Sequence, residues 1–210
     1  MKKLKTLFLG FILVLSLVLT ACGGNKEGKK EEPKKEEMKD AKVSLDMWKG
    51  NWNNIASFLE EKSVKDAFLG LEDGQAKMEK FQKSNAFEFN GMEFEGNKIK
   101  FYDKTKAKGG KVISEAEYEY VKAHPAKHGK HEFNWYEFKA KNADAKYPVI
   151  LLLEAHGEEV MLHYHFKVGK NAEELLKDKE ILTGTFVGES VKVEQIENVV
   201  KTRFNKKEKH

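Results

Sequence analysis

The sequence predicts a small antiparallel β-barrel or sandwich with helices at both ends. Apolar residues alternate with polar ones in about six to eight short segments between residues 87 and 167, which is the pattern of half-buried strands. Glycines at tight-turn positions separate several of these segments. No helix-length segment stands between consecutive strands, so a parallel sheet with crossover helices is disfavoured.

The composition supports one folded domain with appendages. The chain has 210 residues, 38 Lys and Arg against 34 Asp and Glu, and a formal net charge of +4. Its 14 Phe, 6 Tyr and 3 Trp are too many for a wholly disordered chain. Because Lys and Glu are mixed throughout, the charge pattern disfavours nucleic-acid binding. The single cysteine excludes an intrachain disulfide, so burial or a ligand must hold the fold.

The N-terminus has the order of a secretory signal peptide. Basic residues at 2–5 precede an apolar run, Leu7–Leu19, which is too short for the roughly 20 residues of a permanent membrane helix. The following stretch, Leu19-Thr20-Ala21-Cys22-Gly23, resembles the lipobox of bacterial lipoproteins. This resemblance implies that residues 1–21 are a lipoprotein signal peptide and that Cys22 is lipidated. Cleavage before Cys22 would lower the formal net charge to +1.

Residues 22–44 carry mixed charges, and Met38 is the single large apolar side chain between Gly23 and Lys42. Such a segment buries too little apolar surface to order itself, and Pro33 interrupts any helix. We expect a disordered charged tether with a reach of ~25 Å. The folded domain is then expected over residues 45–210.

Helical spacing of apolar residues predicts a short amphipathic helix over Leu45–Phe58, with Ser44 or Asp46 at its start. Four further helices are predicted over Ser63–Leu69, Gln75–Lys83, Glu173–Lys177 and Val191–Phe204.

Period-two alternation predicts the strands between these helical regions. Turns are expected at Gly91 and at Gly96-Asn97. The predicted strand segments are Phe87–Phe89, Met92–Phe94, Ile99–Phe101, Glu115–Val121, Phe133–Phe138, Val149–Leu153 and Val160–Lys167.

Three histidines are candidates for a metal site. His163 and His165 stand two residues apart in a predicted strand and so point to the same face. If that face lines a barrel interior or mouth, both imidazoles converge there. His156 follows the preceding apolar strand and can approach from the neighbouring strand of a hairpin. Three neutral imidazoles suit Zn²⁺ at ~2.0–2.1 Å and leave a fourth position for another ligand.

The connection between these histidines leaves two geometries open. A tight turn at Gly157-Glu158 would pair His156 with Glu159, ~13 Å along the strand from His163, and joint ligation would fail. A wider loop over 157–162 would place His156 opposite His163 and within chelating reach. Without convergence, the three are ordinary half-exposed strand histidines.

The second half of the chain contains Lys146-Tyr147, Leu153-Glu154-Ala155-His156, His163-Tyr164-His165, Val168-Gly169-Lys170 and Glu173-Glu174-Leu175-Leu176. These segments resemble the C-terminal half of the ZinT (YodA) family, which are bacterial zinc-binding proteins of calycin, or lipocalin-like, fold. Upstream, Trp48-Lys49-Gly50-Asn51-Trp52 is similar to the WxGxW pattern of the same family. The similarity runs from about Leu45 to Lys201. It implies a calycin-like barrel in which His156, His163 and His165 are metal ligands on one wall.

The sequence also departs from the family pattern. Ala155 replaces the acidic residue before the first ligand, and the loop to the second histidine is shorter than in typical members. Residues 181–186 replace an aromatic-rich segment of the family, and a Lys- and Glu-rich tether replaces its His-rich tail. These differences indicate a diverged member.

A second cluster, His124, His128 and His131, falls in an expected turn-rich loop. It is either an auxiliary low-affinity metal-capture site or an exposed hairpin loop. Glu158 and Glu159 are expected to be solvated turn residues, although either is a candidate fourth ligand. His210 is expected to be a free tail.

The resemblance and the histidine chemistry together predict a zinc-binding lipoprotein, not an enzyme. It would be anchored to the cell membrane on the extracytoplasmic face, capture or buffer Zn(II), and deliver it to a metal ABC importer or the importer's binding protein. One alternative is a calycin-type carrier of an apolar small ligand. A less favoured one is a His₃-zinc hydrolase, since no strong general base or oxyanion hole stands beside the cluster.

Overall fold

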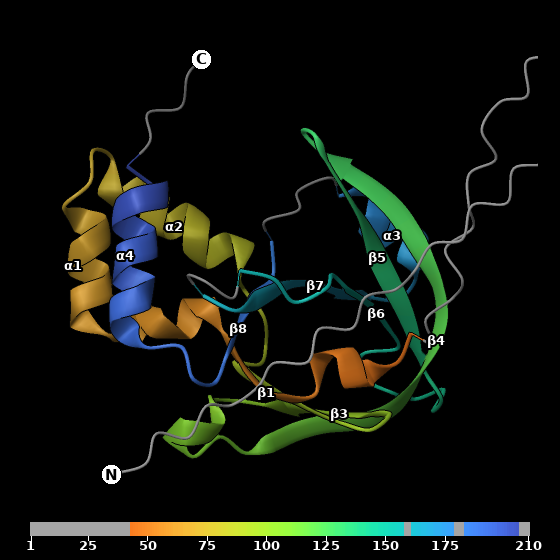
Figure 1. Ribbon diagram of the computed structural model, residues 1–210. Coiled ribbons are helices and arrows are strands. Elements are labelled where there is room, and N and C mark those ends of the chain that lie inside the picture. Colours follow the sequence, from red (N-terminus) through yellow and green to blue (C-terminus); the bar gives the residue numbers. More distant parts are fainter. Residues whose placement is uncertain (1–42, 158–160, 179–182, 206–210) are drawn as a thin grey trace, which may run out of the picture. The chain divides into compact units, whose positions relative to one another are not determined.

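The computed structural model describes residues 43–157, 161–178 and 183–205. Within these ranges, eight antiparallel strands close into a barrel in sequence order, and the last strand pairs with the first (Figure 1). The predicted antiparallel barrel of calycin-like form is therefore confirmed. The strands are β1 (Gly50–Asn54), β2 (Gly91–Glu95), β3 (Lys98–Tyr102), β4 (Val112–His128), β5 (His131–Ala140), β6 (Val149–Leu152), β7 (His163–Gly169) and β8 (Thr185–Gly188).

Helices flank the barrel on two sides. Figure 1 shows α1, α2 and α4 gathered together, whereas α3 packs against β6 and β7. The α-helices are α1 (Lys62–Leu69), α2 (Gly74–Ser84), α3 (Ala172–Lys177) and α4 (Val193–Arg203). Short 3₁₀ helices are η1 (Leu45–Trp48), η2 (Ile55–Glu60) and η3 (Lys106–Lys108).

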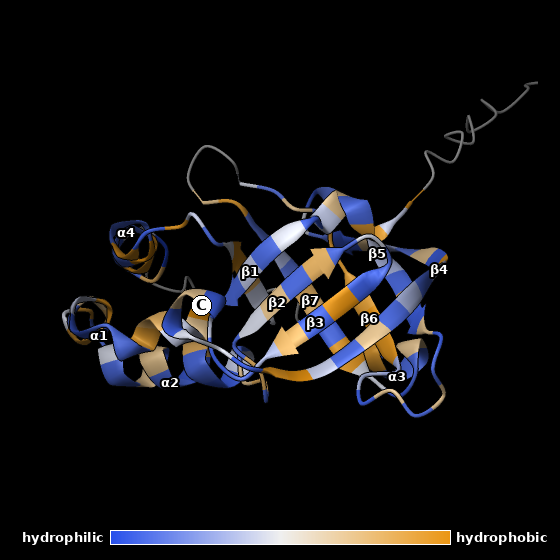
Figure 2. Cartoon of the chain, turned by 90° about the horizontal axis from the view of Figure 1, so that it is seen from below, coloured by the Kyte–Doolittle hydropathy of each residue, from blue (hydrophilic) through white to orange (hydrophobic). Residues whose placement is uncertain are grey.

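Aromatic side chains fill the barrel interior. The alternation of apolar and polar residues along the strands, visible in Figure 2, directs one set inward and the other outward. The inward set packs edge to face, as in the pair Trp52–Tyr164, whose ring centroids lie 4.7 Å apart. The most deeply buried members of this core are Trp48, Phe89, Phe94, Phe101, Phe138, Tyr164, Phe166 and Phe186.

Two smaller cores lie outside the barrel wall. Residues of α1, α2 and α4 pack with Val187 of β8 and with Met161. On the other side, Ala172 of α3 packs with Trp135 and Leu151. Apolar clusters therefore cover the outside of the barrel on two sides. The outward face of β7 lies between these two clusters.

The odd-numbered face of β7 turns out to be this outward face. Tyr164 and Phe166 belong to the barrel core, whereas the Lys167 ammonium lies 5.4 Å from the Trp135 ring centroid, in the outer core. His163 and His165 share the Lys167 face. The sequence left open whether this face of the strand lines the barrel interior. The structure shows that the imidazoles of His163 and His165 lie on the outside of the barrel.

The helix predicted over Leu45–Phe58 is wrong. The segment forms η1, then β1, then η2. Gly50 has φ +121°, a value that no helix accommodates. β1 pairs with both β2 and β8 and so closes the barrel. Long-range strand pairing thus overrides an apolar spacing that suits a helix.

The loop predicted around His124–His131 is also wrong. These residues continue β4 and β5 as a long hairpin whose turn is only Gly129-Lys130. Gly129 has φ +60°, as a tight two-residue turn requires. Phe87 and Phe89 were predicted as a strand but precede β2, although Phe89 is buried in the barrel core.

The other expected helices are confirmed. The structure places α1, α2, α3 and α4 over the four segments predicted after Phe58, with ends shifted by at most two residues. None of the helices in the described part of the chain is both long and apolar enough to span a bilayer. The predicted signal peptide, Cys22 and most of the tether lie outside the described residues, as does His210.

Candidate metal centre

The loop between β6 and β7 brings His156 opposite His163. The two residues form an antiparallel bridge. The His156 N–H donates to the His163 carbonyl at 2.8 Å, and the His163 N–H donates to the His156 carbonyl at 2.9 Å. Of the two geometries that the sequence left open, the structure has the wider loop.

Gly157 makes this arrangement possible. Its φ is +82°, and its carbonyl accepts from the Met161 N–H at 2.7 Å. A Cβ at this position would lie 2.7 Å from the Met161 oxygen and 2.9 Å from Nδ1 of His163. Glycine is required here both for the backbone conformation and for space against the His163 ring.

The three imidazoles converge. One ligand nitrogen from each of His156, His163 and His165 lies within 4.8 Å of the other two. The ring centroids are 4.1 Å apart for His156 and His163, 5.6 Å for His156 and His165, and 5.4 Å for His163 and His165. His165 is 4% exposed, His163 is half-buried and His156 is exposed. His165 thus forms the buried side of the cluster, and His156 lies on its solvent-exposed side.

Hydrogen bonds occupy the Nδ1 atom of each ring. Nδ1 of His156 lies 2.8 Å from the Glu154 carbonyl, and Nδ1 of His163 lies 2.8 Å from the Met161 carbonyl. A carbonyl only accepts, so both Nδ1 atoms carry the proton. Nδ1 of His165 lies 3.2 Å from the Thr185 hydroxyl oxygen. For His156 and His163 this pattern favours Nε2 as the metal-binding atom, as is usual where the other ring nitrogen donates to a neighbouring carbonyl.

Burial keeps two of the imidazoles neutral. Burial is the main cause that lowers the pKa of His165 to about 3; the neighbouring His163 and His156 add to it, and a hydrogen bond with the Thr183 backbone opposes it. The pKa of His163 is lowered too, first by burial, while its bond to the Met161 carbonyl opposes the shift. Neutral imidazole is the form that binds a metal. The rings of His163 and His165 are therefore already in the metal-binding form at neutral pH and release no proton when a metal binds.

The donor set fits a zinc ion. Three imidazole nitrogens on a rigid wall, with room for a fourth ligand on the exposed side, match the chemistry of open zinc sites. Within the described ranges, this is the one group of three or more His, Cys, Asp or Glu residues with ligand atoms close enough to share an ion.

Two solved structures have the same fold. The first is the crystal structure of Zn(II)-bound AdcA from Streptococcus pneumoniae, with a TM-score of 0.55 and 16% identity. That match covers 78% of this chain and 35% of AdcA, so this chain spans about a third of the length of AdcA.

The second is the Zn(II)-bound ZinT-like domain of AdcA from Streptococcus pneumoniae, with a TM-score of 0.56 and 17% identity. The match covers 76% of this chain and 90% of that domain. The chain has the fold of a ZinT-like domain. No protein-family model and no curated protein sequence matches it.

The second histidine cluster does not assemble on this ZinT-like barrel. Nε2 of His124 lies 2.6 Å from a carboxylate oxygen of Glu137, whereas His128 and His131 face each other at the exposed hairpin tip. The Glu154 carboxylate accepts from the Tyr136 hydroxyl at 2.5 Å, so the Glu154 residue contacts the His156 ring through its backbone carbonyl. Glu158 and Glu159 lie outside the described residues.

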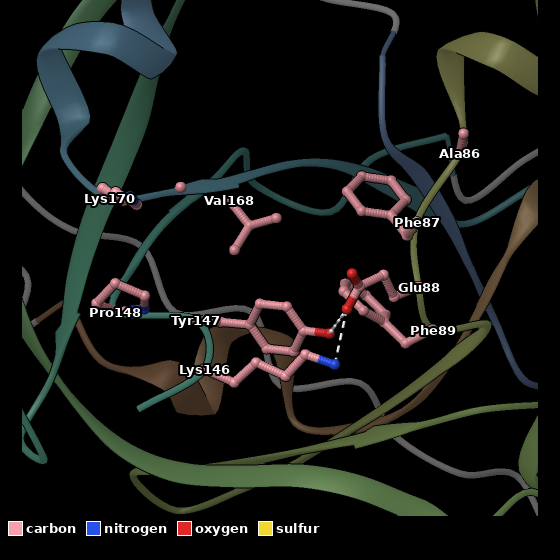
Figure 3. A pocket seen from close by; sticks show the side chains of 10 residues that line it. Ala86, Phe87, Glu88, Phe89, Lys146, Tyr147, Pro148, Val168 and Lys170 are labelled. Atoms are coloured by element: carbon pink, nitrogen blue, oxygen red, sulfur yellow. Dashed lines mark hydrogen bonds and ion pairs between the residues drawn. The ribbon is translucent and has the colours of Figure 1, made fainter. Parts of the chain in front are cut away.

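A cavity of about 310 Å³ opens at the barrel end where β6 begins and β7 ends. Figure 3 shows Phe87, Val168 and Tyr147 turned into it, with Glu88 and Lys146 paired at its edge. The Lys146 ammonium lies 2.7 Å from the Glu88 carboxylate. The cavity lies at the end of β7 away from His163, and two of the residues that line it, Phe89 and Tyr147, belong to the aromatic core of the barrel.

Sequence reasoning found the three histidines but missed the residues around them. Gly157, Met161 and Thr185 each contact a candidate ligand. The one available signal was the glycine directly after His156, which marks a position that needs a left-handed backbone.

Proposed function

We propose that this protein binds Zn(II) through Nε2 atoms of His156, His163 and His165. The observation that carries the proposal is the convergence of the three rings to within 4.8 Å, with Nδ1 of each held by a neighbouring group. The two solved structures that share this fold are both Zn(II)-bound. When bound, the ion would take its fourth ligand from the open side beside His156, where another molecule can reach it.

The proposed role is capture or buffering, not catalysis. No described carboxylate belongs to the cluster with the histidines, so a general base for a zinc-bound water is not supplied there. Because His156 is exposed, an ion bound by the cluster could instead enter and leave from the solvent side.

The central test is a calorimetric zinc titration with elemental analysis. Wild-type protein should bind one tight equivalent, and the His163→Ala/His165→Ala variant should lose that site. The matched control, His128→Ala/His131→Ala, removes the same residue types from the exposed hairpin tip and should keep it. A tight site that survives in the first variant, or vanishes only in the control, would show that the ligands are misassigned.

We further propose that the protein is a lipoprotein, lipidated at Cys22, which holds the zinc-binding domain on the extracytoplasmic face of the cell membrane. The support is the signal-peptide order followed by the only cysteine at the lipobox position. Two or more acyl chains would give stable anchoring, whereas one binds only marginally. Expression with labelled palmitate should label the wild-type membrane fraction and not Cys22→Ser, and equal labelling of both would refute the anchor.

Delivery to a metal importer is the last step of the proposal. Its support is the ZinT-like fold shared with AdcA and the exposed side of the histidine cluster. Deleting the gene should slow zinc-limited growth and cellular zinc uptake, and the His163→Ala/His165→Ala variant should fail to restore them. Full restoration by that variant would exclude a role for the cluster in uptake.

A further inference from the structure

The barrel wall beside His165 holds a set of buried polar residues that metal ligation by itself does not explain. Asn54, Asn85 and Thr185 are 1%, 2% and 8% exposed. Burying such groups is costly unless each makes hydrogen bonds, so their partners indicate what they hold in place.

Asn85 joins the end of α2 to the start of β8. Its Nδ2 donates to the Phe81 carbonyl at 2.8 Å, and its own carbonyl accepts from Nδ2 of Asn54 at 2.9 Å. Its Oδ1 accepts from the Thr185 N–H at 2.7 Å. Both ends of the Asn85 amide are therefore used to fix the first residue of β8 against the helix.

Thr185 is in turn the neighbour of the buried ligand. It stands opposite His165 in the pairing of β7 with β8, and its hydroxyl oxygen lies 3.2 Å from Nδ1 of that ring. The backbone on its N-terminal side is also fixed, because the Gly184 N–H donates to the Ser84 carbonyl at 2.9 Å. The backbone of Thr185 is thus held in place beside the imidazole.

We infer that Thr185 and Asn85 are positioning residues of the metal site. Thr185 accepts a hydrogen bond from Nδ1–H of His165, which leaves Nε2 for the ion, and Asn85 holds Thr185 in the place where it does so. The inference rests on the proposed zinc function. It adds a chain of hydrogen bonds that connects the end of α2, through Asn85 and Thr185, to the buried His165. Neither residue belongs to the proposed ligand set.

The first test is zinc affinity in position 185 variants. Thr185→Val keeps the branched shape and removes the hydroxyl, and we expect affinity to fall about 10-fold at unchanged stoichiometry. Thr185→Ser should restore most of it. Thr105→Val is the matched control, since Thr105 is also buried, at 6% exposed, but precedes η3 and contacts no histidine of the cluster. Wild-type affinity in Thr185→Val would overturn the inference while leaving the proposed function intact, whereas no zinc binding by the wild type would overturn both.

The role of Asn85 is tested by non-additivity. If Asn85 acts through Thr185, the double variant Asn85→Ala/Thr185→Val should bind zinc no more weakly than Thr185→Val alone. Additive losses would show that Asn85 acts by another route. The visible spectrum of the cobalt-loaded protein, which reports coordination geometry, should change in Thr185→Val and stay unchanged in Thr105→Val.

A measurement on the wild type guards against variants that do not fold. Long-range ¹H–¹⁵N NMR of the zinc-loaded protein should show His165 protonated at Nδ1 and metal-bound at Nε2. Metal at Nδ1 of His165 would contradict the inference, because the Thr185 hydroxyl would then have no proton to accept.

Discussion

At the residue scale, the histidine cluster depends on small neighbours as much as on its ligands. Gly157 allows His156 to stand opposite His163, and the Met161 carbonyl holds the His163 ring. The three candidate ligands could be predicted from their spacing and from the family resemblance. Their partners could not, because backbone carbonyls and a glycine carry no sequence pattern specific to metal binding.

Replacing Gly157 should damage the site more than the fold. In Gly157→Ala, the Cβ would come within 2.9 Å of Nδ1 of His163 and meet a positive φ. We expect a loss of stability of ~1–2 kcal/mol and a larger proportional loss of zinc affinity. Urea unfolding measures the loss of stability, and zinc titration measures the loss of affinity. Gly129→Ala, also at positive φ but with open space around its Cβ, is the control and should leave zinc affinity unchanged. Equal affinities in Gly157→Ala and wild type would contradict this account.

The buried imidazoles should make the metal-free protein sensitive to acid. The pKa of His165 is lowered to about 3, from the ordinary value near 6.5 that it regains on unfolding. Between these values the unfolded chain binds the proton and the folded chain does not, so stability is present above pH ~6.5 and falls as pH decreases toward ~3. His165→Gln should flatten the dependence of unfolding free energy on pH in this window. An unchanged slope would show that His165 does not remain neutral.

At the scale of elements, the long, strongly patterned segments were predictable and the barrel-closing ones were not. The helices over residues 62–84 and 193–203 and the hairpin of β2 with β3 follow from local periodicity. β1 and β8 have only five and four residues. They carry Gly and Asn that signal turns, and they become strands because each pairs on both sides. A local pattern does not contain that information.

Lys167 should stabilise α3 from the outer face of β7. Its ammonium donates to the Leu175 carbonyl at 3.4 Å and to the Asp178 backbone carbonyl, and it lies 5.4 Å from the Trp135 ring centroid. Lys167→Met keeps the apolar stem but leaves carbonyls at the end of α3 unpaired, so we expect a loss of ~1–3 kcal/mol. The urea midpoint should fall at constant slope. The exposed control, Lys170→Met, should change stability by less than ~0.5 kcal/mol, and equal effects would contradict this role.

At the scale of the whole molecule, side chains pack the interior of the calycin-like barrel, and a cavity of about 310 Å³ lies at one end of it. Large aromatic residues at 0–2% exposure occupy the interior, and the histidine cluster stands on the outer wall. The same barrel topology that holds an apolar ligand when hollow serves here as a rigid support.

The filled interior predicts that native protein binds no apolar ligand there. A fluorescent hydrophobic probe such as 1-anilinonaphthalene-8-sulfonate should show no saturable enhancement with the wild type. Phe166→Ala should lower stability by about 3–5 kcal/mol, because Phe166 lies in the centre of the aromatic core. Saturable probe binding to the wild type that a small apolar competitor displaces would favour the carrier alternative.

The most direct test of the account is X-ray absorption spectroscopy of the zinc-loaded protein. We predict a four-coordinate ion with three imidazole nitrogens at ~2.0–2.1 Å and one further light-atom ligand. In His163→Ala/His165→Ala, the three-imidazole signature should be absent. A sulfur ligand, an all-oxygen shell or the same imidazole count in both proteins would show that zinc does not bind at His156, His163 and His165.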